Sequence, residues 1–217
     1  MIQLHHINKT FNSLSKPTEA LQDLNLDINE RAFCVIRGPS GSGKTTLLMC
    51  IGGMLKPSSG TVRIQGQDIY SLKNNERSRF RASSIGFVFQ SFYLVPYLNV
   101  VENVLLSGGL VKDGNEQHKA TELIDQLGLS DRILHKPSEL SAGECQRVAL
   151  ARALIHQPAF ILADEPTGNL DPENSAEVIN ILHDYHKKGG TVILVSHGKD
   201  ADRYADHMIV LEKGKII

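Results

Sequence analysis

The sequence has no long apolar segment. None of its stretches approaches the ~20 consecutive apolar residues that a membrane-spanning helix needs, and the N-terminus has no signal-peptide pattern. We therefore expect a soluble, cytoplasmic protein that acts at a membrane only through a partner. Its 217 residues fit one domain or two closely joined lobes.

Cysteine is scarce, and neither sign of charge is in excess. Cys34, Cys50 and Cys145 are widely spaced and form no Cys-x-x-Cys pair. We therefore expect buried or inert thiols in a reducing compartment, not a redox or metal centre. The 23 basic and 24 acidic residues nearly cancel, which argues against a sequence-independent grip on nucleic acid or anionic lipid. No internal repeat or low-complexity tract is evident.

Two kinds of strand pattern are present. Alternation of apolar and polar residues, typical of half-buried strands, occurs around Ile2 and Leu4, Leu24 to Ile28, and Val62 and Ile64. Continuous apolar runs, typical of strands covered on both faces, occupy residues 33–36, 160–163 and 191–195. The sequence therefore predicts strands of both kinds, half-buried and fully buried.

Helical spacing follows two of the buried runs. Leu48, Ile51 and Leu55 predict a helix after the first run. Asp171-Pro172 has the form of an N-cap followed by proline at the first helical position, and Gly189-Gly190 supplies a stop.

The rest of the chain completes a mixed fold. Residues 208–211 and 216–217, joined through Lys213-Gly214, predict a terminal hairpin. Residues 92–156 lack buried-strand runs and are expected to be helical. We infer an α/β core with an antiparallel β edge and a helical insertion.

A phosphate-binding loop is the first motif with chemical content. Residues 38–45 fit the pattern G-x-x-x-x-G-K-[ST], between a buried strand and an amphipathic helix. Glycines let backbone N–H groups turn inward, and the helix N-terminus adds partial positive charge. Lys44 would reach the β- and γ-phosphates, and the Thr45 hydroxyl would bind Mg²⁺.

Two carboxylates follow the second buried run. Asp164 and Glu165 stand where a buried strand meets the loops, and open α/β sheets bind ligands at the carboxyl ends of their strands. Asp164 would hold Mg²⁺, and Glu165 would polarise the attacking water. The alternative is a helix cap or a solvated loop, which the phosphate loop makes the weaker interpretation.

Residues 141–144, Ser-Ala-Gly-Glu, form a capping box at the start of a further predicted helix. Capping alone explains the pattern. A helix start with exposed N–H groups is also an anion site, so the two interpretations are compatible.

Taken together, six motifs in order resemble the ATP-binding subunits of ABC transporters. They are residues 38–46, Gln90, Leu140–Glu144, Asp164–Glu165, Asn169–Asp171 and Ser196–His197. The resemblance spans nearly the whole chain. It implies a P-loop NTPase (RecA-like) core formed by residues 1–90 and 157–217, with an antiparallel β subdomain and an inserted α-helical subdomain at 91–156.

The resemblance also implies a homodimer. Two subunits of the family pack head to tail around two ATP molecules, so Ser141 and Gly143 would touch the γ-phosphate bound by the other chain. Asp171 would cross the seam between the subunits. His197 matches the switch histidine of the family, and Gln90 matches its Mg²⁺-sensing glutamine.

The implied site residues fall into three groups. The implied catalytic residues are Glu165, His197 and Lys44. The implied Mg²⁺ ligands are Thr45, Gln90 and Asp164. The implied ATP contacts are Phe11, which would stack on adenine, and Gly38, Pro39, Ser40, Gly41, Ser42, Gly43, Lys44, Thr45, Thr46, Gln90, Ser141, Gly143, Glu144 and Asp171.

Two positions depart from the family pattern. Ala142 replaces the first glycine of the usual signature, which is harmless in a helical backbone and unfavourable at positive φ. Arg31-Ala32 stands where a Gly-Glu turn is common, which should affect only the turn. Since neither departure falls on a charged catalytic residue of the family pattern, we expect an active ATPase.

The aromatic stretch Phe92–Tyr97 follows Gln90 directly. It could pack into the helical core or form part of a groove, near Gln90–Tyr97, for a helix of an integral membrane permease-type partner. The resemblance favours the groove. It also implies a peripheral position on the cytoplasmic side of the inner membrane.

The stretches 91–104 and 163–171 most resemble the lipoprotein-releasing, macrolide-exporting and cell-division branch. Transport and regulation of a cell-wall hydrolase both remain open, because the two differ in the partner. A nucleic-acid ATPase is disfavoured by the balanced charge and by the lack of coiled-coil or zinc insertions. His5-His6 and the pair His183 and His186 complete no metal site, so we expect surface or packing roles.

Overall fold

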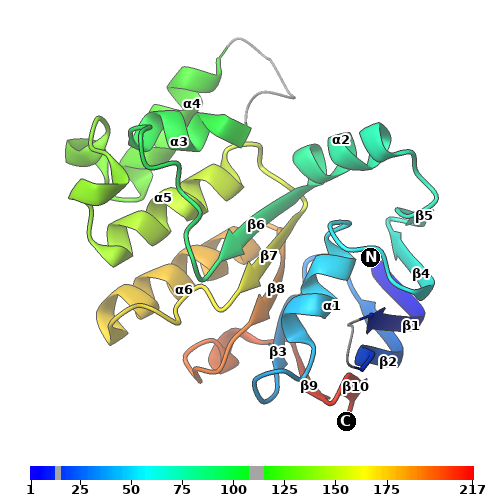
Figure 1. Cartoon of the computed structure of the whole chain (residues 1–217). Helices are drawn as coiled ribbons and strands as arrows, with labels where there is room; N and C mark the ends of the chain where they lie inside the picture. Colours follow the sequence, from blue (N-terminus) through cyan, green and yellow to red (C-terminus); the bar gives the residue numbers. More distant parts are fainter. Residues whose placement is uncertain (13–15, 108–114) are drawn as a thin grey trace.

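The computed structural model describes residues 1–12, 16–107 and 115–217. Its strands form two sheets, with helices gathered around the larger one (Figure 1). The predicted α/β core with an antiparallel β part and a helical insertion is confirmed. In these described parts, no helix is both long and apolar enough to cross a membrane.

The larger sheet has the strand order β10-β9-β3-β8-β7-β6. Neighbouring strands from β9 to β6 are parallel, and only β10 runs antiparallel, against β9. The carboxyl ends of the parallel strands therefore meet at one edge, where open α/β sheets bind ligands. The strands are β3 (Phe33–Arg37), β6 (Ile85–Phe89), β7 (Phe160–Asp164), β8 (Thr191–Val195), β9 (His207–Glu212) and β10 (Lys215–Ile216).

The smaller sheet is antiparallel, in the order β2-β1-β4-β5. Its strands are β1 (Ile2–Phe11), β2 (Thr18–Ile28), β4 (Ser59–Ile64) and β5 (Gln67–Asp68). Helix α1 (Lys44–Ile51) contacts β1 and β2 on one side and β7 and β8 on the other. One hydrophobic cluster joins both sheets through α1, which fixes the start of that helix, and the loop before it, at the edge of the larger sheet.

The other helices form two further packing groups. Helix α6 (Pro172–Lys187) covers one face of the larger sheet, while α3 (Val100–Leu105), α4 (Glu116–Gln126) and α5 (Ala142–Leu154) share a separate cluster at one end of the molecule (Figure 1). Helix α2 (Asn74–Ser84) precedes β6. Short 3-10 turns occupy Ser130–Arg132, Pro137–Glu139 and Asp202–Tyr204. The expected helical character of residues 92–156 is confirmed for α3, α4 and α5, whereas residues 92–99 are not helical. Residues 108–114 lie outside the described parts.

Most predicted elements are confirmed, and one prediction is wrong. The three continuous apolar runs are β3, β7 and β8, and the terminal hairpin is β9–β10. The helix predicted through Leu55 ends at Ile51 instead. The chain turns at Gly52 and at Gly53, whose φ is +66°. A Cβ atom at Gly52 would lie 1.9 Å from the ring of Phe87, so this turn is packed tightly against β6.

Candidate nucleotide-binding site

The predicted phosphate loop connects β3 to α1 and packs closely against β9 of the larger sheet and β2 of the smaller sheet. A Cβ atom at Gly38 would lie 2.0 Å from the carbonyl oxygen of Leu211 in β9, and one at Gly43 would lie 2.3 Å from that of Ala20 in β2. Both glycines have positive φ, +149° and +103°, so no other residue fits easily. Nothing among the described residues lies within 4 Å of the same point at Gly41, which leaves the loop accessible.

Lys44 lies inside this loop. Its side chain is buried, and Nζ donates hydrogen bonds to the carbonyl oxygens of Gly38, at 2.8 Å, and Pro39, at 3.0 Å. An ammonium group has three N–H donors, so one can still reach a phosphate oxygen. Because α1 begins at Lys44, its unpaired N–H groups also point toward the loop. The loop is therefore built for an anion.

Asp164 ends β7 beside Thr45. Burial raises the pKa of Asp164 most, and the negative charge of Glu165 raises it further, while the hydrogen bond from the Thr45 side chain and the charge of Lys44 lower it. One carboxylate oxygen, Oδ1, is buried and has no hydrogen-bond partner among the described residues. A carboxylate with an unsatisfied oxygen next to a hydroxyl fits the oxygen ligands that Mg²⁺ prefers.

Glu165 and His197 meet at the same edge. The backbone N–H of Glu165 donates to the carbonyl oxygen of Val195 at 2.9 Å, which holds the chain against the end of β8. His197 follows that strand, and its Nε2 lies 3.0 Å from Oε1 of Glu165. The imidazole is about half exposed, so both side chains can face a ligand at the phosphate loop.

Gln90 follows β6, next to the end of β7. Its Nε2 donates to Oδ1 of Asn169 at 3.4 Å, and Asn169 Nδ2 donates back to the carbonyl oxygen of Gln90 at 3.2 Å. A Cβ atom at Gly168 would lie 2.7 Å from Gln90 Nε2, so the loop after β7 packs directly on this glutamine. The structure thus joins the predicted Mg²⁺-sensing residue to the loop after the acidic pair.

The predicted capping box is present. Ser141 is the N-cap of α5: its hydroxyl accepts from the N–H of Glu144 at 3.2 Å, and Glu144 Oε2 accepts from the N–H of Ser141 at 2.7 Å. The bond from Ser141, together with the guanidinium of Arg132, lowers the pKa of Glu144 to about 2, against a smaller opposing effect of burial. Ala142 is the first helical residue, and its φ is not positive. The departure at this position is therefore compatible with the local backbone.

The start of α5 packs on the start of α6. Asp171 caps α6 by accepting from the N–H of Asn174 at 2.9 Å and from its Nδ2 at 2.6 Å. A Cβ atom at Gly143 would lie 1.9 Å from Oδ1 of Asn174, which also accepts from Arg147 at 3.2 Å. The glycine at 143 is thus required by the close approach of the two helices.

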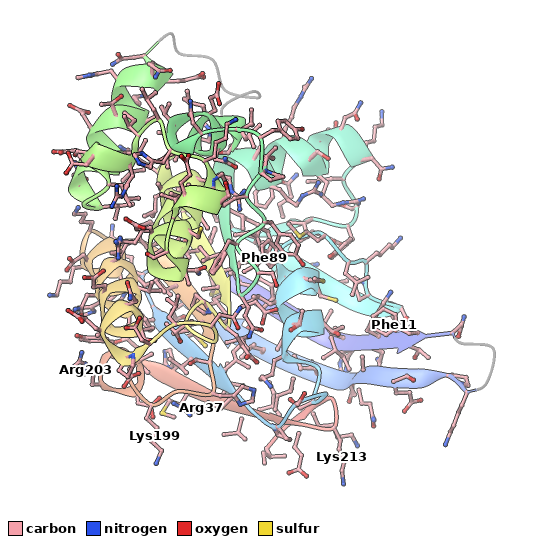
Figure 2. All side chains as sticks on the ribbon, turned by 60° about the vertical axis from the view of Figure 1, so that its left-hand side comes forward. Phe11, Arg37, Phe89, Lys199, Arg203 and Lys213 are labelled. Carbon is pink, nitrogen blue, oxygen red and sulfur yellow. The ribbon has the colours of Figure 1, made fainter. Side chains whose placement is uncertain are left out.

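The structure does not bring all predicted residues together. The starts of α5 and α6 lie at the left of Figure 1, away from the loop between β3 and α1. Ser141 and Asp171 are the N-caps of these two helices. Within one chain, the phosphate loop and the signature are therefore separate. Phe11 ends β1, in the sheet that flanks the loop (Figure 2). The residue is 42% exposed, and the Lys9 ammonium lies over its ring, 5.1 Å from the centroid.

The aromatic stretch after Gln90 is not simply core. Tyr93 and Tyr97 are 68% and 74% exposed, whereas Leu94 packs against the cluster of α3, α4 and α5. Arg152 of α5 donates to the carbonyl oxygens of Phe92, at 2.7 Å, and Tyr93, at 2.6 Å. Arg152 was not predicted as a site residue. The sequence marks it only as a charged residue in the last turn of a largely apolar helix.

The remaining cysteines and histidines have structural surroundings. All three cysteines are buried, as predicted, and burial raises the pKa of Cys34 and of Cys50 to about 12. His6 Nδ1 lies 2.7 Å from Asp23, and His183 stacks on Tyr204 with ring centroids 3.9 Å apart. In the described ranges, no group of three or more His, Cys, Asp or Glu could hold a metal ion.

Comparison with known proteins agrees with this geometry. A family model described as ABC transporter matches residues 21–168. The lipoprotein-releasing system ATP-binding protein LolD of Bacteroides thetaiotaomicron is 42% identical over 221 residues, covering 100% of this chain and 99% of LolD. The macrolide export ATP-binding/permease protein MacB of Bdellovibrio bacteriovorus is 40% identical over the whole chain, which corresponds to 33% of MacB.

A solved structure has the same fold over the full length. The dimeric post-hydrolysis state of the ATP-binding cassette MJ0796, bound to ADP and Pi, superposes with a TM-score of 0.92. It is 37% identical, and the match covers 100% of this chain and 96% of that one. The chain therefore belongs to the ABC transporter family, as an ATP-binding subunit that hydrolyses ATP with Mg²⁺.

Proposed function

We propose that two copies of this chain form two composite sites, each made from the phosphate loop of one copy and the signature of the other. The observation that carries this proposal is the separation of the two elements within one chain (Figure 1). Each is a helix start suited to an anion, and neither can complete the other in the same molecule. A two-fold related pair would bring each loop opposite a signature.

In this proposal the phosphate loop binds the nucleotide. Backbone N–H groups of residues 40–46 and the ammonium of Lys44 would surround the phosphates, and Phe11 offers an exposed ring for adenine. Thr45, Asp164 and Gln90 would hold Mg²⁺. The ion would neutralise charge on the β- and γ-phosphates when bound.

Glu165 is the proposed general base. Its carboxylate would orient a water molecule and take its proton as the water oxygen bonds the γ-phosphorus and the bond to the ADP oxygen breaks. His197, 3.0 Å from Glu165, would hold that carboxylate and contact the γ-phosphate. The third catalytic residue is Lys44, which would stabilise the charge that develops on the transferred group.

The second copy would supply Ser141 and Gly143 to the γ-phosphate. Glu144 would act indirectly, because its carboxylate is already committed to the Ser141 backbone and to Arg132. Asp171 would cross the seam beside the opposite site. Since Asn174 contacts both Asp171 and Gly143, the two elements would move as one unit.

We further propose an integral membrane permease-type partner, docked near Gln90–Tyr97. The exposure of Tyr93 and Tyr97 supports an apolar contact there. The chain would then lie peripherally on the cytoplasmic side of the inner membrane and would not bind nucleic acid. The similarity to LolD and MacB favours lipoprotein or macrolide-type export over cell-division regulation.

The subdomains would move relative to each other. The core, residues 1–90 and 157–217, would move against the helical subdomain, residues 91–156.

Glu165→Gln tests the paired arrangement. The variant should bind ATP, hydrolyse it at least about a hundredfold more slowly because the base is neutralised, and accumulate as a dimer with ATP and Mg²⁺. Size exclusion with light scattering measures the mass. The matched control is Glu122→Gln, at an exposed position of α4. A variant that binds ATP yet stays monomeric would contradict the proposal.

A further inference from the structure

Arg37 is the last residue of β3 and stands directly before the phosphate loop. The four preceding residues of the strand are buried and apolar, so a cation at this position is unexpected for a central strand. Arg37 pairs with Val210 of β9, and the neighbouring Ile36 pairs with Val195 at the end of β8. Its side chain therefore starts next to the place where the His197 loop leaves the sheet.

The guanidinium of Arg37 holds that loop by its backbone. Nη1 donates to the carbonyl oxygen of His197 at 3.2 Å, and Nη2 donates to that of Gly198 at 2.5 Å. Nε and Nη2 also donate to Oδ1 of Asp202, which balances the charge. All three nitrogens are thus engaged with one segment, and the Arg37 side chain is only 18% exposed.

The same loop carries the imidazole that meets Glu165. The loop turns tightly, since the Ser196 hydroxyl accepts from the N–H of Gly198 at 3.1 Å. Beyond the contact with Glu165, the His197 ring is about half exposed. Its placement therefore depends on the backbone that Arg37 fixes. At the other end, Arg37 is bonded to Gly38, whose carbonyl oxygen accepts from Lys44.

We propose that Arg37 is a positioning residue for ATP hydrolysis: it fixes the backbone of His197 and Gly198 so that the imidazole stays at Glu165, and it ties this loop to the phosphate loop. The inference rests on the proposed role of His197. Arg37 itself touches neither nucleotide nor water in this account. Its effect is therefore on the rate of the chemical step and not on binding.

The chemistry of the contact requires arginine. Two carbonyl oxygens and a carboxylate are reached by one planar group with donors in a fixed fork. Lysine keeps the charge but offers a single nitrogen, and methionine keeps the apolar stem alone. Both substitutions should release the loop, so Arg37→Lys should resemble Arg37→Met more than the wild type.

The experiment compares steady-state ATPase kinetics of the full chain. For Arg37→Met and Arg37→Lys we expect kcat to fall roughly tenfold to a hundredfold, as for a displaced catalytic group, with KM for ATP within about twofold of wild type. Arg203→Met is the matched control. Arg203 follows Asp202 directly but lies over Tyr204, 4.7 Å from the ring centroid, farther left in Figure 2. It should leave both constants unchanged.

A double-mutant cycle separates positioning from general damage. In a His197→Ala background, Arg37→Met should lower kcat no further, because the group that it positions is gone. A wild-type kcat in Arg37→Met, or an equal loss with and without His197, would overturn the inference. A wild-type kcat in His197→Ala would instead contradict the proposed function of His197.

Should Arg37→Met not fold, Asp202→Asn replaces it. This change weakens the charge-assisted bonds that orient the guanidinium and leaves the carbonyl contacts. We expect a smaller loss of kcat, about threefold to tenfold, which again disappears in the His197→Ala background. An unchanged kcat in Asp202→Asn would then overturn the inference.

Discussion

Asp164 carries a carboxylate at the end of β7 that is partly buried, and one of its oxygens has no hydrogen-bond partner within the described residues. Burial raises its pKa, because a charged group loses hydration there. The nearby Glu165 adds like-charge repulsion. In the absence of a cation, this arrangement opposes folding, while the same unsatisfied oxygen is what an ion would bind.

Asp164→Asn keeps the side-chain shape and removes the charge. Because the pKa of Asp164 is higher in the folded than in the unfolded protein, the wild type loses stability as the pH rises through that raised pKa. The variant has no such titration. We therefore expect it to gain stability relative to wild type between acidic and neutral pH, in urea unfolding without Mg²⁺, and to lose Mg²⁺-dependent ATPase activity. A stability difference that does not change with pH would contradict the argument.

The contact with Asn174 requires glycine at position 143. A methyl group there would meet the Asn174 side chain, which the N-cap Asp171 and Arg147 hold in place. Gly143→Ala must therefore break those hydrogen bonds or shift α5. We expect a loss of about 1–3 kcal/mol in the free energy of unfolding, measured by urea denaturation.

The adjacent position is the control for Gly143. Ala142 is exposed at the first turn of α5, in helical conformation. Ala142→Gly, which recreates the more usual signature, should cost less than about 1 kcal/mol. Equal losses at the two positions would mean that helix propensity, and not the contact with Asn174, decides the effect.

Among the elements, α5 links the two regions that move in the proposed cycle. It begins at the signature and, near its end, Arg152 holds the backbone of Phe92 and Tyr93. Burial lowers the pKa of Arg152, as expected for a cation surrounded by protein. A partner that displaces the segment after Gln90 would therefore pull on the helix that carries Ser141.

Arg152→Met should free the segment after β6. The apolar stem still fits its site, but two charge-assisted hydrogen bonds are lost. Hydrogen exchange should become at least about tenfold faster at the amides of Val95 and Leu98, which donate to Asn103 and Val95, since each 1.4 kcal/mol of lost protection corresponds to a factor of ten. Exchange in β3, β7 and β8 should not change. Arg79→Met, on exposed α2, is the control, and protection of these two amides equal to wild type would contradict this coupling.

The elements were predictable where the signal was local. Continuous apolar runs predicted β3, β7 and β8, because a strand covered on both faces has no polar side. The end of α1 was also marked locally, since Gly52-Gly53 stops the helix as Gly189-Gly190 stops α6, and the prediction through Leu55 overlooked it. What the sequence could not show is that the ring of Phe87 packs against Gly52. The strand β6 carries the same kind of apolar run and could have been predicted from it.

In the candidate site, too, local sequence signals were predictive and contacts between distant residues were not. The loop pattern and the strand end predicted Lys44, Asp164 and Glu165, and the family resemblance implied His197; the structure brings these four residues to one edge of the sheet. The residues that hold them were not predictable. Arg37 reaches His197 across 160 positions of sequence, a contact that no periodicity or spacing encodes.

In the whole molecule, the N-termini of α1 and α5, both suited to bind an anion, lie apart (Figure 1). A single copy therefore holds two incomplete halves of a site, and we propose that nucleotide joins them between copies. Ser40, in the phosphate loop, and Ser141, at the signature, are both exposed. The three natural cysteines are buried. New cysteines at the two serines would therefore be the accessible thiols.

The most direct measurement is cross-linking between two differently tagged versions of the chain, both with Glu165→Gln. One carries Ser40→Cys and the other Ser141→Cys, so a short bis-maleimide can join these two sites only between molecules. With ATP and Mg²⁺ we expect a product that contains both tags, and little of it without nucleotide. Absence of that product, in a sample that light scattering shows to be dimeric, would contradict the composite site.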